Sequence, residues 1–192
     1  LLVLLITAVI TFNETLGINE VTLFNGSVVI DYLSSFMKIV TLVAAFLVLI
    51  ISSNYLKSLK ILKIEYPILI LCSVLGMMIM ISSNDLIVFY MGLELQSLAL
   101  YVLASFNRDQ IKSSEAGLKY FVLSALSSGL LLYGCSLIYG FTGSTNFNVI
   151  ANELNSNEYA LTFGIVFILV GLSFKISAVP FHMWAPDVYE GS

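Results

Sequence analysis

Long apolar stretches separated by short polar segments dominate the sequence. Six such stretches occupy residues 1–12, 32–53, 67–83, 85–106, 114–141 and 160–180. A helix needs about 20 apolar residues to cross the hydrocarbon core of a bilayer. Backbone polar groups in that core must be satisfied within the segment itself, so spans of this length are helical. The pattern predicts an all-α protein: a polytopic bundle of about six transmembrane helices in a single transmembrane domain over residues 1–192.

Both ends of the chain fall in unusual places for such a bundle. The first stretch begins at Leu1 rather than at methionine and is too short to cross a membrane. The chain stops at Ser192, directly after a loop-like stretch. We therefore expect a bundle that is truncated at both ends.

Among the connections between the predicted helices, only alternate ones contain basic residues. Lys57, Lys60 and Lys63 follow the second stretch, and Arg108 and Lys112 follow the fourth. The intervening connections, residues 13–31, 83–84 and 142–159, contain neither lysine nor arginine. The positive-inside rule predicts that both basic loops face the cytoplasm, or the matrix of a mitochondrion.

Composition strengthens the membrane assignment and narrows the function classes. Charged residues make up 10% of the chain, whereas soluble domains carry about 25%. A net charge of −4 without a basic patch excludes nucleic acid as an expected partner and leaves the lipid bilayer. A nucleotide-binding glycine loop and a cysteine cluster are absent, and the sequence has one histidine. We expect no metal, no cofactor and no catalytic redox residue in this chain.

Glu94 is the leading candidate for chemistry. A charge at the centre of a membrane helix costs at least about 2.5–3.5 kcal/mol, so it is a functional candidate by default. Tyr90, Glu94, Ser97 and Tyr101 are spaced by four, three and four residues, which places them on one helical face. This polar stripe either carries protons or joins helices through structural hydrogen bonds. We favour proton translocation.

Lys175 is the second candidate and lies five residues before Pro180. Gly164 and Gly171 share its helical face, which allows another backbone or water to approach. We expect Pro180 to end the regular helix and residues 181–186 to continue irregularly at membrane depth, lining a polar cavity. The alternative is a lysine whose long side chain reaches the membrane interface.

Lys119 and His182 are further candidates for proton translocation with weaker support. Glu115 lies four residues before Lys119, so the two residues could equally form an interfacial ion pair. His182 is either a titratable relay after the broken helix or, beside Trp184, part of an aromatic belt at the interface.

Four segments carry a family resemblance: residues 92–98, 115–120, 130–134 and, most specifically, 174–191. They resemble the antiporter-like subunit N of proton-pumping NADH:quinone oxidoreductase, whose mitochondrial counterpart is NADH dehydrogenase subunit two. The resemblance implies a membrane-arm subunit that translocates protons through a buried Glu/Lys charge row, coupled to quinone reduction elsewhere in the complex. It also implies that Glu94 is the channel glutamate and Lys175 its partner.

The resemblance implies an environment as well. We expect other membrane-arm subunits as partners, with NADH, flavin, iron–sulfur clusters and quinone bound elsewhere, so this chain is a non-redox subunit of the enzyme. The expected location is a bacterial inner membrane, with the mitochondrial inner membrane as the alternative. Alternative functions are a subunit of a multisubunit cation/proton antiporter or membrane-bound hydrogenase, or a structural spacer. The Trp-Ala-Pro-Asp-Val-Tyr-Glu-Gly sequence at residues 184–191 favours subunit N.

Overall fold

The computed structural model describes residues 1–15, 20–59, 61, 63–153 and 158–192. Its helices are α1 (Leu2–Thr15), α2 (Tyr32–Ser58), α3 (Glu65–Ile81), α4 (Leu86–Ala104), α5 (Ile111–Thr142), α6 (Phe147–Glu153), α7 (Glu158–Lys175) and α8 (Ala185–Gly191). Its strands are β1 (Val21–Leu23) and β2 (Val28–Ile30). Each of the six predicted spans overlaps one helix, α1 to α5 and α7, and the largely helical architecture confirms the predicted fold class.

Four short elements, β1, β2, α6 and α8, lie in segments where the apolar pattern predicts no helix. The β1–β2 hairpin pairs Val21 with Ile30 in antiparallel register and occupies the connection between the first two spans. Helix α6 lies within residues 142–159, and α8 follows the irregular segment after α7. Elements of three or seven residues are too short to produce a readable hydrophobic period.

The membrane-crossing potential of the helices varies with their length. Among the described residues, three helices are long and apolar enough to cross a membrane: Tyr32–Ser58, Leu86–Ala104 and Ile111–Thr142. Three shorter apolar helices cover Leu2–Asn13, Glu65–Ile81 and Leu161–Lys175. Large apolar side chains are exposed along the bundle, for example Ile51 and Leu126, as expected for a surface that faces lipid.

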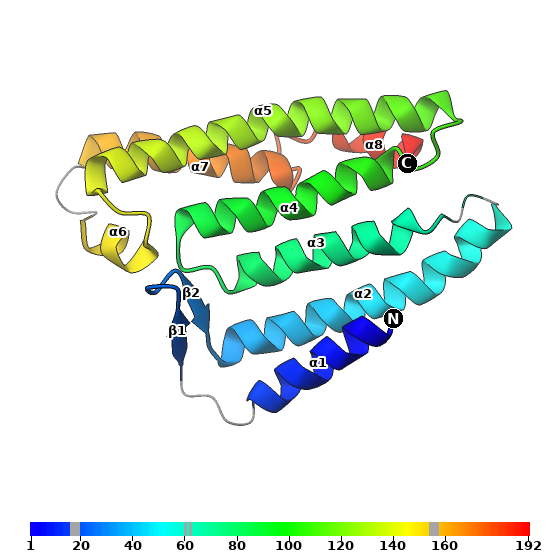
Figure 1. The fold of residues 1–192 in the computed structure, drawn as a ribbon. Coiled ribbons are helices and arrows are strands. Elements are labelled where there is room, and N and C mark those ends of the chain that lie inside the picture. The colour runs from blue at the N-terminus through cyan, green and yellow to red at the C-terminus, as the bar shows by residue number, and fades with distance from the viewer. Residues whose placement is uncertain (16–19, 60, 62, 154–157) are drawn as a thin grey trace.

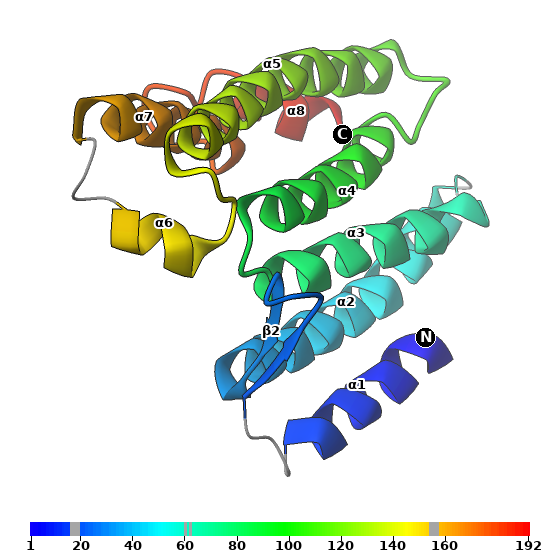
Figure 2. The ribbon, with the colours of Figure 1, turned by 60° about the vertical axis from the view of Figure 1, so that its left-hand side comes forward.

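The helices form a row that ends in a cluster. Helices α1, α2, α3 and α4 lie side by side in chain order, and α5 and α7 lie on the far side of α4 from α3 (Figures 1 and 2). Both α4 and α7 pack against α5, which also contacts α8. Helix α5 is therefore the element on which the candidate residues of α4 and α7 are brought together.

Both basic loops lie at the same end of the bundle. The α2–α3 and α4–α5 connections are found at the right-hand end in Figure 1. These connections contain Lys63 and Arg108, Lys57 lies in the last turn of α2 and Lys112 in the first turn of α5. Lys60 lies outside the described residues. The arrangement agrees with the alternation from which the cytoplasmic side was predicted.

Glycines let the paired helices approach closely. A Cβ atom added to Gly92 of α4 would lie 2.8 Å from the backbone nitrogen of Met80 in α3. One added to Gly134 of α5 would lie 2.7 Å from the backbone oxygen of Gly164 in α7. Small residues at such contacts are typical of helix packing in membranes, where close backbone approach supplies van der Waals attraction.

The hairpin closes the opposite end of the bundle. Asn84, at the α3–α4 turn, and Asn146, before α6, both donate side-chain hydrogen bonds to the backbone oxygen of Gly26. Asp85 caps α4 by accepting from the backbone nitrogen of Ile87 at 2.8 Å, and also accepts from the Thr145 hydroxyl. These bonds connect the hairpin, α4 and α6 at one end of the molecule.

Candidate functional site

The polar stripe of α4 surrounds the ammonium group of Lys175. The Lys175 Nζ lies 3.3 Å from Glu94 Oε1, 3.1 Å from Ser97 Oγ and 2.9 Å from Tyr101 Oη. An ammonium group has three protons to donate, and the stripe provides three acceptors. The spacing predicted that four residues share one face of α4. Three of them, Glu94, Ser97 and Tyr101, contact the ammonium group of Lys175.

The pair between Glu94 and Lys175 is largely removed from solvent. The Lys175 side chain is 10% exposed and that of Glu94 is 20% exposed. Ser97 and Tyr101 are buried beside them. Two opposite charges of this kind are tolerated in a low-dielectric interior because each compensates the other. The Lys175 side chain contacts α4 instead of extending to the membrane interface.

Helix α7 ends at Lys175, earlier than predicted. Ser177 adopts a left-handed conformation, with φ at 56°. The Ala178 nitrogen donates to the Ser173 oxygen at 2.8 Å, and the Ser177 nitrogen donates to the Phe174 oxygen at 3.1 Å. This pair of bonds is a Schellman motif, which ends a helix by satisfying its last carbonyl groups. The prediction that Pro180 ends the helix was wrong, because the turn at Ser177 precedes it.

Ser128 of α5 completes the site and was not predicted. Its side chain is buried, and its hydroxyl donates a hydrogen bond to Glu94 Oε1, the oxygen that Lys175 contacts. Ser124, Ser127 and Ser128 are all buried, and the last two follow Ser124 by three and four residues, which places them near one face of α5. That spacing indicates a second polar face. Serine is common in membrane helices, however, where its hydroxyl often forms hydrogen bonds between helices, so the spacing does not by itself identify a functional residue.

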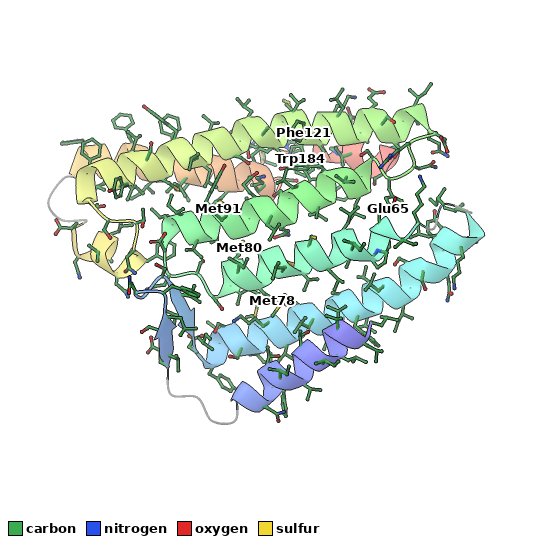
Figure 3. The ribbon with its side chains drawn as sticks, in the orientation of Figure 1. Glu65, Met78, Met80, Met91, Phe121 and Trp184 are labelled. Atoms are coloured by element: carbon green, nitrogen blue, oxygen red, sulfur yellow. The ribbon has the colours of Figure 1, made fainter. Side chains whose placement is uncertain are left out.

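Aromatic side chains connect the site to α8. The Tyr120 ring lies 4.7 Å from the Trp184 ring, with 8° between their planes, and makes a T-shaped contact with the Tyr101 ring at 4.7 Å. The Trp184 Nε1 donates to the backbone oxygen of Phe174 at 3.1 Å. Figure 3 places Trp184 near α8 and beneath α5. The residue before α8 is thus anchored to the last turn of α7.

Lys119 lies in a separate cluster of charges. Its Nζ is 2.8 Å from Glu115 Oε1 and 2.8 Å from Asp187 Oδ2, and its side chain is 42% exposed. The ion pair with Glu115 that the spacing allowed is formed, and Asp187 of α8 adds a second carboxylate. These residues line an open polar cleft between α5 and α8 together with Lys112 and Glu190. Within the described residues, no ion pair or hydrogen bond joins Lys119 to Glu94 or Lys175.

His182 lies in the turn between α7 and α8. Its side chain is exposed, and its backbone oxygen accepts from the Ala185 nitrogen at 3.1 Å. The structure does not bring its ring to the Glu94–Lys175 pair through any hydrogen bond between described residues. Across the described ranges, no group of three or more histidine, cysteine, aspartate or glutamate side chains could hold a metal ion.

Apolar helices that hold an acid–base pair between α4 and α7 are features of a polytopic membrane protein. The chain belongs to the family described as "NADH:quinone oxidoreductase/Mrp antiporter, TM", which matches residues 83–192. That range begins before α4 and includes Glu94, Ser128 and Lys175.

Sequence relatives indicate which member of this family the chain resembles. The chain is 75% identical to NADH-quinone oxidoreductase subunit N of Pelagibacter ubique, over 98% of this chain and 40% of the relative. It is 60% identical to subunit N of Bartonella bacilliformis, over 88% of this chain and 35% of the relative. These findings confirm the predicted resemblance to subunit N and the prediction of a bacterial membrane protein.

Solved structures share the fold. A chain of respiratory complex I from Thermus thermophilus with bound aureothin matches with a TM-score of 0.76 and 30% identity, over 98% of this chain and 40% of that chain. A chain of the archaeal membrane-bound sulfane sulfur reductase matches with a TM-score of 0.83 and 25% identity, over 100% and 41%. The present chain thus spans about 40% of the length of the first of these relatives.

Proposed function

We propose that the chain acts in the membrane arm of an NADH:quinone oxidoreductase and translocates protons through Glu94 and Lys175. The observation that carries this proposal is the buried pair itself, with 3.3 Å between Nζ and Oε1 and the two residues on different helices. The name NADH-quinone oxidoreductase subunit N, borne by relatives up to 75% identical, supports the assignment to that complex.

The mechanism follows from the mutual dependence of the two charges. The carboxylate of Glu94 favours a protonated lysine, and the ammonium group of Lys175 favours an ionised carboxylate, whereas burial opposes both charges. When a proton neutralises Glu94, Lys175 loses its compensating charge and releases a proton onward. A movement that separates α7 from α4 has the same effect, because it removes all three acceptors of the ammonium group.

The redox reactions belong to other parts of the complex in this proposal. We propose that other membrane-arm subunits pack against it and that NADH oxidation, electron transfer and quinone reduction occur elsewhere. Lys119 and His182 stay predicted members of the route. Both are more accessible than Lys175, so we place them at the exposed part of the path near α8.

Two alternatives remain for comparison: a subunit of a related membrane complex, and a structural spacer. The fold match to the sulfane sulfur reductase shows that related complexes use the same architecture, but the higher identity to subunit N favours the quinone oxidoreductase. A structural spacer would keep the pair only as a contact between α4 and α7, and proton pumping would then survive its removal.

The test measures proton pumping per NADH oxidised in membrane vesicles that contain the whole complex with the full-length subunit. Glu94→Gln removes the charge while conserving shape, so we expect the complex to assemble and the protons pumped per NADH to fall. The matched control is Glu65→Gln, which makes the same change at an exposed glutamate at the first residue of α3 (Figure 3).

The comparison separates the candidate functions. Reduced pumping in Glu94→Gln with normal pumping in Glu65→Gln supports proton transfer through the pair. Normal pumping by a fully assembled Glu94→Gln complex would leave the structural spacer as the better description.

A further inference from the structure

One oxygen atom of Glu94 is the meeting point of three helices. Glu94 Oε1 belongs to α4, accepts from Lys175 of α7 at 3.3 Å, and also accepts from the Ser128 hydroxyl of α5. Within the described residues, no hydrogen bond reaches the second oxygen, Oε2. The two oxygens of the same carboxylate are therefore in different environments.

Ser128 is held where it can act on Glu94. It is 4% exposed on α5, the helix against which both α4 and α7 pack. Gly171 of α7 lies close to this part of α5, because a Cβ atom added to it would meet the Ser127 backbone oxygen at 3.0 Å. Ser128 is therefore a buried residue at a level where α5 and α7 pack closely.

We propose that Ser128 is a positioning residue that holds Oε1 of Glu94 toward Lys175 and leaves Oε2 as the atom that receives the transferred proton. This inference rests on the proposed function and identifies its acceptor atom. A carboxylate held through one oxygen by two donors loses both bonds if it rotates away, so its orientation is maintained.

The hydroxyl matters most when the ion pair is weakened. A proton added to Oε2 neutralises the carboxylate, so the ion pair with Lys175 is lost and only a hydrogen bond from the ammonium group remains. The remaining carbonyl oxygen, Oε1, still accepts from Ser128, because a neutral carboxyl group keeps its acceptor capacity. Ser128 then keeps Glu94 beside Lys175 until the proton leaves, whereas without it the neutral side chain is free to change rotamer.

The test uses the complete complex with three substitutions in the full-length subunit. Ser128→Ala removes the donor and is expected to lower protons pumped per NADH by roughly two- to tenfold, the range that one hydrogen bond controls. Ser128→Thr keeps the hydroxyl and should restore pumping. Ser124→Ala is the matched control, since Ser124 is a fully buried serine one turn away whose hydroxyl has no hydrogen-bond partner among the described residues.

Infrared spectroscopy detects the hydrogen bond between Ser128 and Glu94 directly, which a pumping assay does not. The carboxyl band of Glu94 is identified by its loss in Glu94→Gln. Its frequency should shift in Ser128→Ala, return in Ser128→Thr and stay unchanged in Ser124→Ala. If Ser128→Ala fails to assemble, Ser128→Cys conserves volume with a weaker donor and should give a smaller shift in the same direction.

The two readouts separate failure of this inference from failure of the proposed function. Normal pumping by Glu94→Gln contradicts the proposed function, and the infrared band still tests the bond between Ser128 and Glu94. An unshifted band in Ser128→Ala, or a pumping loss that adds to that of Glu94→Gln in the double variant, contradicts the role of Ser128. If Ser128 acts through Glu94, the double variant should pump no less than Glu94→Gln alone.

Discussion

Lys175 and Lys119 are both ion-paired lysines on apolar helices, but they differ in what surrounds the pair. The Lys119 contacts are the shorter, at 2.8 Å to each carboxylate, against 3.3 Å from Lys175 to Glu94. By distance alone the Lys119 pairs would be the stronger, but the Lys119 side chain is 42% exposed and that of Lys175 is only 10% exposed. Water and salt screen an exposed pair, so geometry alone does not measure its contribution.

The acceptors also differ in charge. Lys175 meets one carboxylate and two hydroxyl groups, so its site is neutral overall. Lys119 meets two carboxylates, which gives a cluster with one excess negative charge. A neutral site suits a low-dielectric interior, and an excess charge is tolerated where water can solvate it. The same type of ion pair therefore lies in a neutral, largely buried site at Lys175 but in a negatively charged, more exposed cluster at Lys119.

The largest expected effect comes from removing one member of the buried pair. Glu94→Gln or Lys175→Met alone leaves the other charge without its partner in a largely buried site, and should lower the free energy of unfolding by up to about 3–5 kcal/mol, the cost for a fully buried pair. The double variant should be destabilised by less than the sum of the two. Denaturation of the purified full-length subunit in detergent micelles measures all three values, and strictly additive effects would show that the two residues do not interact.

The next effect concerns the distance between α5 and α7. A Cβ atom at position 134 would lie 2.7 Å from the Gly164 oxygen, so Gly134→Ala should cost about 1–3 kcal/mol through overpacking and reduce pumping by displacing Lys175. The matched control is Gly129→Ala on the same helix, where an added Cβ atom meets nothing within 4 Å. That change should be neutral or mildly stabilising, by at most about 1 kcal/mol.

Equal losses in both glycine variants would show that helix flexibility, not close packing, is what the two positions provide. The same denaturation assay in detergent distinguishes these outcomes. The Lys119 cluster lies between α5 and α8, so its contacts should survive Gly134→Ala.

The smallest expected effect is that of Lys119→Gln. Because its partners are more than half exposed, the change in the free energy of unfolding should be smaller than for Lys175→Met and should shrink further in high salt. The Debye length falls from about 10 Å at 0.1 M to about 3 Å at 1 M ionic strength. Lys112→Gln, at a pair that is 77% exposed, is the control.

Pumping measured on the same variants sharpens the comparison. A Lys119→Gln complex that pumps as poorly as Lys175→Met, at every salt concentration, would place Lys119 in the proton path despite its exposure. Normal pumping would leave it as a contact between α5 and α8.

The sequence predicted those features that depend on long-range regularity. Apolar runs located six helices, and the spacing of Glu94, Ser97 and Tyr101 placed them on the face that Lys175 contacts. It also indicated that Gly164 and Gly171 allow close approach, and α5 packs there. A buried ionisable residue in an apolar run stands out in sequence because it is so costly in lipid.

Features that depend on tertiary contacts could not be predicted in the same way. Ser128 became part of the site only because α5 crosses α4 at the level of Glu94, and a serine in a membrane helix carries no sign of its partner. The end of α7 was misplaced because Ser177 occupies the left-handed position that glycine usually takes. Asp187 came within reach of Lys119 because α8 folds back along α5.

The stacked rings beside the site give the chain an optical reporter. Trp184 is its one tryptophan, and it stacks on Tyr120, whose neighbour Tyr101 accepts a hydrogen bond from Lys175. Indole emission responds to the packing and polarity around the ring. A shift of Tyr101 that accompanies proton release from Lys175 would therefore reach the indole through two ring contacts and change its fluorescence. Light emitted near α8 would then follow, in real time, the charge state of a lysine buried between α4 and α7.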